Sequence, residues 1–474
     1  MRALLDRACA RHGDAPYLVF RDTTWSYART GEITDSLAAG LLALGIAPGE
    51  RLAIRLPTGP DHLFLWLASA KAGIVSCPLH PDLSEAEAGA ALAFLEPRAV
   101  VRASGAIAVG GTVAARVEEL LAARMSLAGA DHPTADTIAT ILTTSGTTGA
   151  PKAAMLSHRM AVLTGEAFAS WLGLTARDRL FTCLPLSHIN ARFYSTIGAL
   201  AAGASLAIEE RFSASRFWTW LRETGATEVN AIGAMLKILL ERPPSEEDRA
   251  HGLRLVYAAP ALGREAHLEF ERRFGTRLVI GYGLTESTFG FIHPLSGPRD
   301  LDSMGIPRRH PDSALPSDVR LEDGEVWLKN PATFSGYFKD DAATNEAFAD
   351  GGWLKTGDLA TLGDDGSYTF AGRKKLVIRR RGENLTPGEV EAVLEAHPAI
   401  AEAAVVGVPS SLGEDDVMAF VALRPGLSAS EEELTGFCSA RLAPFKVPTR
   451  WQVLDRIPRT PTQRIAYERL TRSE

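Results

Sequence analysis

Short apolar runs alternate with longer segments of helical periodicity through the first part of the chain. Residues 51–56 and 74–78 form apolar runs of strand length, and the segment 62–72 between them repeats apolar residues at helical spacing. Further helices are expected at 30–47, with Thr30 as the cap, and at 113–123. Because such alternation is typical of β-α-β units, we predict an α/β fold with doubly wound sheets.

The pattern changes near residue 317, where short strands and turns replace the long alternation. Asp323-Gly324 and Asp365-Gly366 are hairpin-turn sequences, which indicates a small β subdomain. Five later segments are expected as helix, strand, strand, helix and strand: 387–396, 401–408, 417–423, 430–442 and 449–454. We therefore predict a large N-terminal domain, residues 1–374, and a small mobile α+β domain, residues 375–474, with a hinge at Lys375.

Composition narrows the class of protein. With 474 residues, of which 46% are hydrophobic, the chain is long enough for two or more domains with ordinary cores. The net charge of −7 gives no basis for nucleic-acid binding, and no apolar run reaches membrane-spanning length. The four cysteines lack metal-site spacing and the first residues lack a signal-peptide pattern, so we expect a cytoplasmic protein.

One stretch concentrates hydroxyl groups, glycines and a lysine. It reads Thr143-Thr144-Ser145-Gly146-Thr147-Thr148-Gly149-Ala150-Pro151-Lys152 and follows a short apolar segment. Glycines let the backbone approach an anion closely, hydroxyl and N–H groups can bond phosphate oxygens, and the lysine adds positive charge. The spacing differs from that of a P-loop. We predict a loop that wraps a polyphosphate, and a solvated linker is the alternative.

Two further stretches place polar residues after predicted strands. His188 and Asn190 follow the apolar run 180–186, where ligands bind in open α/β sheets, although a capping role for His188 is the alternative. The run 278–280 leads into Gly281-Tyr282-Gly283-Leu284-Thr285-Glu286-Ser287. An aromatic ring there can stack on a base, a threonine can bond phosphate, and a glutamate can hold Mg²⁺. A tight turn with a helix cap at Thr285 or Ser287 is the alternative.

One carboxylate in the β subdomain is a candidate ligand for ribose. Asp358 lies within Lys355-Thr356-Gly357-Asp358-Leu359. At a turn, its oxygens can accept hydrogen bonds from ribose hydroxyls, or they can form an Asx-turn with the local backbone. Both interpretations stay open on the residues alone.

Taken together, these stretches resemble the adenylate-forming superfamily of acyl-CoA synthetases, adenylation domains and luciferases. The resemblance rests on TTSGTTGAPK, GYGLTES, KTGDLA, GRKKLVIRRRGEN and PFKVP, which occur in the family's order over essentially the whole chain. LSHINARFYSTIGALAAGASL and RFSASRFW are similar to small-acid CoA ligases of the crotonobetaine/carnitine type. The resemblance implies that ATP adenylates an acid, that pyrophosphate leaves, and that a thiol, usually that of CoA, then displaces AMP.

The resemblance also implies roles for the matching residues. The implied nucleotide ligands are Thr144, Ser145, Gly146, Thr147, Thr148, Gly149 and Lys152 for the β- and γ-phosphates, Tyr282 with Gly283 for adenine, Thr285 for the α-phosphate, Glu286 for Mg²⁺, and Asp358 and Arg373 for ribose. The implied acid pocket comprises His188, Asn190, Asn230, Gly233, Ala258, Ala259, Gly281 and Gly283, and Gly382 lines the path of the thiol. The implied catalytic residues are Thr285, Glu286, His188 and Arg464, acting by positioning and charge neutralisation.

The chain departs from the family at two places. Pro458-Arg459-Thr460-Pro461-Thr462-Gln463-Arg464-Ile465 puts an arginine where the family has a lysine that joins the α-phosphate and the attacking carboxylate. Arginine keeps the charge but is bulkier and forked. Ala258-Ala259 replaces a common glycine pair, and the added methyl groups favour a small or flat, including aromatic, acid.

The leading hypothesis is therefore an ATP-dependent and Mg²⁺-dependent acid–CoA ligase. A second hypothesis keeps the adenylation but changes the partners, with a carrier-protein thiol or an amine as acceptor, or nitrite activated to diazotise an arylamine. A third is a nucleotide-binding pseudoenzyme that has lost turnover. The intact set of nucleotide ligands, Glu286 included, weighs against the third.

Overall fold

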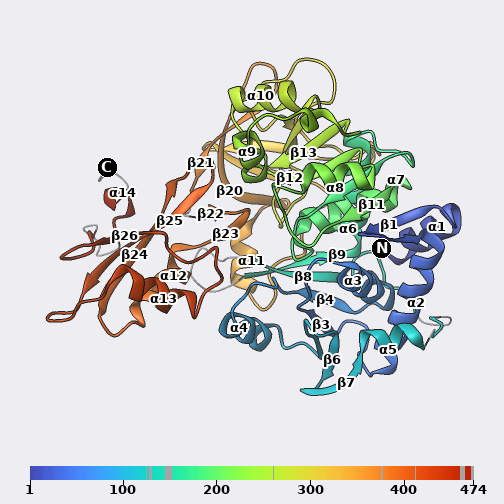
Figure 1. Ribbon diagram of the computed structural model, residues 1–474, viewed down its shortest axis with the longest axis horizontal. Coiled ribbons are helices and arrows are strands. Elements are labelled where there is room, and N and C mark those ends of the chain that lie inside the picture. Colours follow the sequence, from blue (N-terminus) through green and yellow to red (C-terminus); the bar gives the residue numbers. More distant parts are fainter. Residues whose placement is uncertain are drawn as a thin grey trace. The chain divides into compact units, whose positions relative to one another are not determined.

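The computed structural model describes residues 1–123, 125–127, 131–144, 152–259, 261–374, 377–411, 413–459 and 465–470. The chain divides into two compact units (Figure 1). The first comprises residues 1–81, 95–142 and 153–372, and the second comprises residues 82–94, 143–152 and 373–474. Within the described ranges, no helix combines the length and the apolar character that crossing a membrane requires.

The first unit contains a nine-stranded sheet whose central strands are parallel. Its strands, in spatial order, are β16 (Ile306–Pro307), β15 (Phe291–Ile292), β14 (Arg277–Tyr282), β13 (Leu255–Ala259), β12 (Glu228–Ile232), β10 (Arg179–Thr182), β11 (Ser205–Ile208), β1 (Pro16–Phe20) and β2 (Thr23–Ser26). The inner strands are buried on both faces, which explains why the sequence shows continuous apolar runs there rather than alternation.

A second large sheet has seven strands. Its spatial order is β7 (Thr112–Arg116), β6 (Ala106–Val109), β5 (Ala99–Val101), β3 (Arg51–Ile54), β4 (Val75–Pro78), β8 (Ile138–Thr144) and β9 (Lys152–Ser157). Strands β3, β4, β5 and β8 pair in parallel, whereas β6 and β7 form an antiparallel edge. The α/β fold with parallel sheets is thus confirmed.

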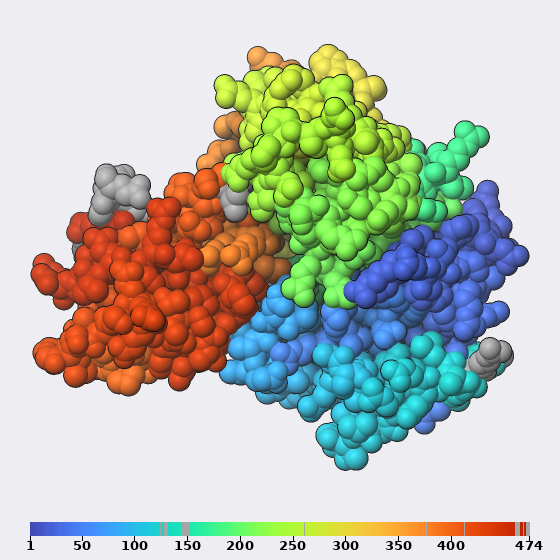
Figure 2. Space-filling model, in the orientation of Figure 1, coloured from blue at the N-terminus to red at the C-terminus, as the bar shows by residue number. Residues whose placement is uncertain are grey.

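Helices connect and cover these strands. Those of the first unit are α1 (Arg2–His12), α2 (Tyr27–Ala43), α3 (Pro60–Ala72), α5 (Val117–Ala122), α6 (His158–Trp171), the π-helix η1 (Asn190–Ile197), α7 (Gly198–Ala202), α8 (Phe217–Thr224), α9 (Gly233–Glu241), the 3₁₀ helix η2 (Glu246–Arg249), α10 (Arg264–Phe274) and α11 (Asp341–Ala347). Ser36 Oγ on α2 donates to the Leu120 carbonyl on α5 at 2.8 Å. The dark-blue and cyan regions are accordingly continuous in Figure 2.

Two helix predictions were wrong in their bounds. The helix expected at 30–47 begins at Tyr27, because the Ser26 side chain accepts the Arg29 N–H and caps it; Thr30 is buried inside the helix. The helix expected at 113–123 begins only at Val117. The preceding residues Thr112–Arg116 pair with β6 as a strand, since tertiary pairing overrides a weak helical pattern.

The β subdomain of the first unit is a five-stranded sheet. It contains β17 (Asp318–Glu322), β18 (Glu325–Lys329), β20 (Trp353–Leu362), β19 (Phe348–Ala349) and β21 (Tyr368–Arg373). Glu322 pairs with Glu325 across a two-residue turn in which Asp323 and Gly324 both have positive φ, 51° and 79°. Two positive φ values define the hairpin turn that an Asp-Gly pair favours.

The second unit has its own core. Its elements are α4 (Glu85–Leu95), β22 (Ile378–Arg380), β23 (Glu383–Leu385), α12 (Pro387–Glu395), β24 (Ile400–Pro409), β25 (Asp415–Leu423), α13 (Glu431–Ser439), β26 (Arg450–Val453) and α14 (Tyr467–Leu470). Val390 and Leu394 of α12 and Val405 and Val421 of the sheet are buried together. The predicted order of helix, strand, strand, helix and strand is confirmed.

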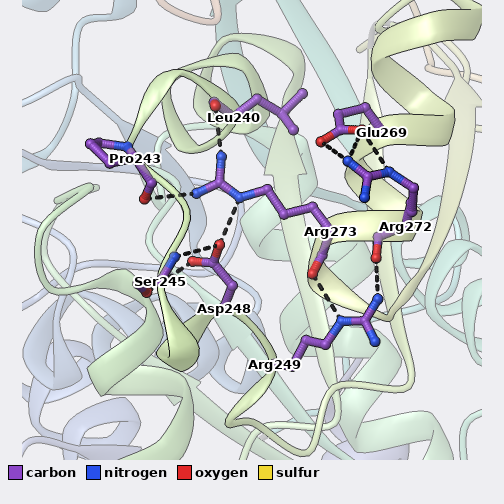
Figure 3. Close-up of polar contacts among 8 residues, drawn as sticks. All are labelled: Leu240, Pro243, Ser245, Asp248, Arg249, Glu269, Arg272 and Arg273. Carbon is purple, nitrogen blue, oxygen red and sulfur yellow. Dashed lines mark hydrogen bonds and ion pairs between the residues drawn. The ribbon is translucent and has the colours of Figure 1, made fainter.

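A buried ion pair fastens three helices of the first unit (Figure 3). Arg273, in the last turn of α10, contacts Asp248 of η2 through Nε at 2.7 Å, and its Nη1 donates to the Leu240 carbonyl on α9. Arg249 in turn donates to the carbonyls of Arg272 and Arg273 at the end of α10. These contacts satisfy helix-terminal carbonyls that would otherwise lack donors.

Candidate active site

Three parallel strands bring the predicted acid-pocket residues to one edge of the nine-stranded sheet. Ala231 of β12 pairs with Ala258 of β13, and Ala258 pairs with Ile280 of β14. The carboxyl ends of the strands therefore meet at the same edge, and Figure 1 shows β12 beside β13. This edge carries Asn230, Gly233, Ala258, Ala259, Gly281 and Gly283. It is where ligands bind in open α/β sheets.

The π-helix η1 lies against this edge. Asn230 Nδ2 donates to Asn190 Oδ1 at 2.6 Å, and the Tyr194 hydroxyl donates to the Thr288 carbonyl at 3.0 Å. Such helices are rare and frequently mark functional sites. His188 lies just before the helix, half-buried, with its ring centroid 6.1 Å from that of His80. The structure thus brings Asn190 and Asn230 into direct contact.

The turn after β14 carries the predicted nucleotide ligands. The Tyr282 hydroxyl donates to Asp358 Oδ2 at 2.6 Å, which joins the predicted adenine-binding ring to the predicted ribose-binding carboxylate. Asp358 is 1% exposed and lies inside β20, so the expectation that it sits at a turn was wrong. Gly357 has φ 73° and the pairing of β20 with β18 shifts register here, so the Gly-Asp pair marks an irregularity within a strand rather than a turn between strands.

Thr285 and Glu286 belong to the same turn. Glu286 Oε1 accepts a hydrogen bond from the Tyr337 hydroxyl at 2.8 Å. The next element after Tyr282 is β15, and in this fully described stretch no helix begins at Thr285 or Ser287, so the helix-cap alternative was wrong. Ser287 instead forms an antiparallel bridge to Thr333. A half-buried carboxylate with a hydroxyl donor on one oxygen is a hard oxygen ligand of the type that fits Mg²⁺.

Several predicted site residues are not among the described residues, and for others only the backbone is described. Ser145, Gly146, Thr147, Thr148, Gly149, Lys375 and Arg464 are outside the described residues, and for Thr144 and Arg373 only the backbone is described. Lys152 begins β9. Gly382 lies at the tip of the β22–β23 hairpin with φ 81°, and its N–H donates to the buried Glu414 at 3.0 Å.

Sequence reasoning missed a buried cluster beneath Gly281 and Gly283. Arg308 Nη1 donates to the Tyr194 hydroxyl and to the Thr288 carbonyl, both at 2.8 Å, and Nη2 donates to the Tyr257 hydroxyl. All three side chains are buried. Burial and the adjoining Arg308 charge act on Tyr194 in opposite directions, and burial prevails, so the pKa of Tyr194 is raised. No local motif surrounds Arg308, so only the fold reveals the cluster.

Comparison with known proteins places the chain in a family. Residues 5–338 match the family described as AMP-binding enzyme, and residues 389–464 match the AMP-binding enzyme C-terminal domain. The chain belongs to the AMP-binding enzyme family. The resemblance to adenylate-forming enzymes is thereby confirmed, as is a mixed α/β fold with a large N-terminal and a smaller C-terminal domain.

Individual relatives match over nearly their full length. The chain is 29% identical to a crotonobetaine/carnitine–CoA ligase of Citrobacter koseri, covering 99% of this chain and 98% of that protein. It is 30% identical to a sulfoacetate–CoA ligase of Cupriavidus necator, covering 98% and 96%.

Solved structures show the same architecture. An o-succinylbenzoate CoA synthetase from Bacillus subtilis, bound to a product analogue, has a TM-score of 0.86 at 26% identity, covering 99% of this chain and 98% of that one. A malonyl-CoA ligase with methylmalonyl-CoA and AMP bound has a TM-score of 0.83 at 28% identity, covering 94% and 97%. An amide bond synthetase from Marinactinospora thermotolerans has a TM-score of 0.83 at 25% identity, covering 99% of each chain.

Proposed function

We propose that this enzyme uses ATP to adenylate a small carboxylic acid and then transfers the acyl group to the thiol of CoA. The observation that carries the proposal is the Tyr282–Asp358 hydrogen bond, which sets an aromatic ring and a buried carboxylate together at the carboxyl edge of the sheet. A ring for adenine beside acceptors for ribose is the arrangement that a nucleotide requires. Family membership and the CoA ligases among the relatives support the same activity.

In this proposal each part of the site has one task. Tyr282 stacks on adenine, Asp358 and Arg373 bind the ribose hydroxyls, and Thr285 bonds the α-phosphate. Glu286 holds Mg²⁺, which when bound neutralises charge on the phosphates. The hydroxyl-rich loop binds the β- and γ-phosphates through Thr144, Ser145, Gly146, Thr147, Thr148, Gly149 and Lys152. His188, Asn190, Asn230, Gly233 and Ala258–Ala259 line the acid pocket.

The reaction then runs in two balanced steps. A carboxylate oxygen of the acid attacks the α-phosphorus of ATP, the bond from that phosphorus to the bridging oxygen breaks, and pyrophosphate leaves. The thiol of CoA next attacks the acyl carbon, loses its proton, and displaces AMP. The chain contributes orientation and charge compensation rather than a covalent intermediate.

The second step is assigned to the C-terminal domain. We place the boundary at residues 374/375, with Lys375 as the hinge and Gly382 beside the path of the thiol. Arg464 takes the place of the family's lysine at the α-phosphate and the attacking carboxylate. Its guanidinium retains the positive charge of the lysine, and in this proposal that charge supports adenylation.

An amine is the second candidate acceptor. The structural similarity to an amide bond synthetase favours an amine over a carrier-protein thiol, because the name of that enzyme specifies a bond to nitrogen rather than to sulfur. The adenylation step is the same for CoA and for an amine.

Pyrophosphate release with MgATP tests the proposal. The panel contains aliphatic, α,β-unsaturated and aromatic acids and nitrite, each with and without CoA, and each with and without an arylamine. Release that needs one acid and is accelerated by CoA is the expected result. Acceleration by an amine alone identifies the second acceptor, and nitrite dependence identifies diazotisation. ATP binding with no release under any condition contradicts the proposal.

A further inference from the structure

Arg308 is a buried cation that has no acidic partner among the described residues. It is 1% exposed and follows β16. The groups that accept hydrogen bonds from its guanidinium are two tyrosine hydroxyls and one backbone carbonyl. Burying a positive charge among neutral groups is strongly unfavourable unless an anion compensates it.

The guanidinium of Arg308 also has more N–H donors than it uses. Of its five N–H groups, three are used by Tyr194, Thr288 and Tyr257. Nε is buried, and no group in the described part of the chain accepts from it. Nε and Nη2 form one edge of the planar guanidinium, the edge that binds the two oxygens of a carboxylate in bidentate pairs. A bound anionic group can satisfy such a buried donor.

This cation lies where the acid is proposed to bind. A Cβ added to Gly281 would clash with Nη2 of Arg308 and with the Tyr257 ring. A Cβ added to Gly283 would lie 3.0 Å from the Tyr194 hydroxyl and 3.4 Å from Nη1 of Arg308. The guanidinium therefore fills the space that side chains at these two glycines would occupy, at the carboxyl edge of β14.

Aromatic rings hold the guanidinium in place. Its carbon lies 4.8 Å from the centre of the Trp171 ring. Phe168 packs edge-on against Tyr257, with centroids 5.1 Å apart, and stacks on Tyr194 at 5.0 Å. These contacts surround the guanidinium with aromatic side chains and restrict its orientation.

We propose that Arg308 is a specificity-determining residue that binds a second anionic group, a carboxylate or a sulfonate, on a short acid substrate. This inference rests on the proposed function and narrows its substrate class. One carboxylate of the acid reacts at the α-phosphate, and the other group meets the Nε–Nη2 edge of Arg308. Tyr194 and Tyr257 fix the guanidinium from η1 and β13.

Matched acids test the inference on the wild-type protein. Pyrophosphate release is measured with propionate against malonate and with butyrate against succinate, and with 3-sulfopropionate as the sulfonate. We expect kcat/KM to be roughly 10- to 100-fold higher for the dianionic acid of each pair, the range for a hydrogen bond to a charged group. Equal or higher kcat/KM values for the monoacids overturn the inference but do not contradict the proposed ligase activity. No release with any acid contradicts the proposed function instead.

Substitutions of Arg308 then test whether this residue causes the preference for diacids over monoacids. Arg308→Met is expected to bring the diacid-to-monoacid ratio to about one through a higher diacid KM, with the KM for ATP unchanged, and Arg308→Lys is expected to retain part of it. Arg192→Met is the comparison variant, because Arg192 is equally buried on η1 and also has donors without acceptors, Nε and Nη1, among the described residues, but it donates to Ser76. A ratio preserved in Arg308→Met, or lost equally in Arg192→Met, overturns the inference. If Arg308→Met does not fold, the wild-type ratios and Arg308→Lys decide.

Discussion

The Tyr337 hydroxyl donates a hydrogen bond to Oε1 of Glu286 at 2.8 Å. Tyr337 lies between β18 and α11, so the contact holds the carboxylate from outside its own turn. Burial, followed by the Glu286 charge, raises the pKa of Tyr337. The hydroxyl therefore remains a donor through the neutral range, and Glu286 presents its other oxygen with a defined orientation.

Glu286→Gln is expected to lower kcat/KM for pyrophosphate release by roughly 10²–10³, because the amide lacks the charge that Mg²⁺ requires. Tyr337→Phe is expected to weaken the apparent Mg²⁺ affinity by about tenfold, the effect of one lost positioning hydrogen bond. A Mg²⁺ titration of pyrophosphate release measures both. Tyr467→Phe is the control, since that hydroxyl also donates to a glutamate, Glu391, at 2.9 Å in the second unit. Equal Mg²⁺ curves for the two tyrosine variants would argue against a metal role for Glu286.

Tyr282→Phe is expected to raise the KM for ATP by roughly tenfold, because Asp358 loses the hydrogen bond from the Tyr282 hydroxyl and reorients. The phenyl ring still stacks on adenine in the proposed complex. Initial rates at saturating acid and varied ATP measure this KM. Tyr368→Phe, which keeps the stacking of that ring on Phe291, serves as the control. A change confined to the KM for the acid would place Tyr282 in the acid pocket rather than at the nucleotide.

Glu228→Gln is expected to stabilise the protein at pH 8 more than at pH 5. Glu228 is fully buried, neither of its oxygens has a partner among the described residues, and burial raises its pKa well above the ordinary value. Above the unfolded pKa the unfolded chain releases the proton that the folded chain keeps, so wild-type stability falls as pH rises. Denaturant unfolding at the two pH values measures the difference. Glu247→Gln, an exposed side chain, is expected to change little; an equal gain at both pH values would contradict the assignment.

Asp248→Asn is expected to cost about 3–5 kcal/mol of unfolding free energy, because it leaves Arg273 buried without its charge partner. Burial alone would raise the pKa of Asp248, but the hydrogen bonds from Arg273 and Ser245 outweigh it and hold the pKa below its ordinary value. The stabilisation that ionised Asp248 gives the folded protein is therefore present above the pKa of this carboxyl in the unfolded chain. It is lost as the pH falls through its pKa in the folded protein. Urea unfolding at pH 7 measures the cost (Figure 3). Asp136→Asn, at an exposed pair with Arg159, is the control and should leave the free energy of unfolding nearly unchanged.

Much of the fold follows from local signals. Apolar runs with intervening helices determined the α/β class, and Asp323-Gly324 determined a hairpin, because burial periodicity and turn dihedrals depend on residues adjacent in the chain. The signals failed at Thr112–Arg116 and at Asp358, where pairing with a distant strand set the local structure. The candidate nucleotide ligands were readable because each motif concentrates unusual residue types within a few positions.

The class of enzyme and the short stretches that carry its chemistry can thus be predicted from the order of the residues alone. Which distant residues come into contact is known from the folded structure: Tyr282 and Asp358 are 76 positions apart, and Arg308 and Tyr194 are 114 apart. Contacts of that kind depend on strand order and helix placement, which no local pattern encodes. The buried guanidinium under Gly281 and Gly283 is likewise visible only in the folded structure. Its Nε has no acceptor among the described residues, and the residues next to Arg308 in the chain do not predict this.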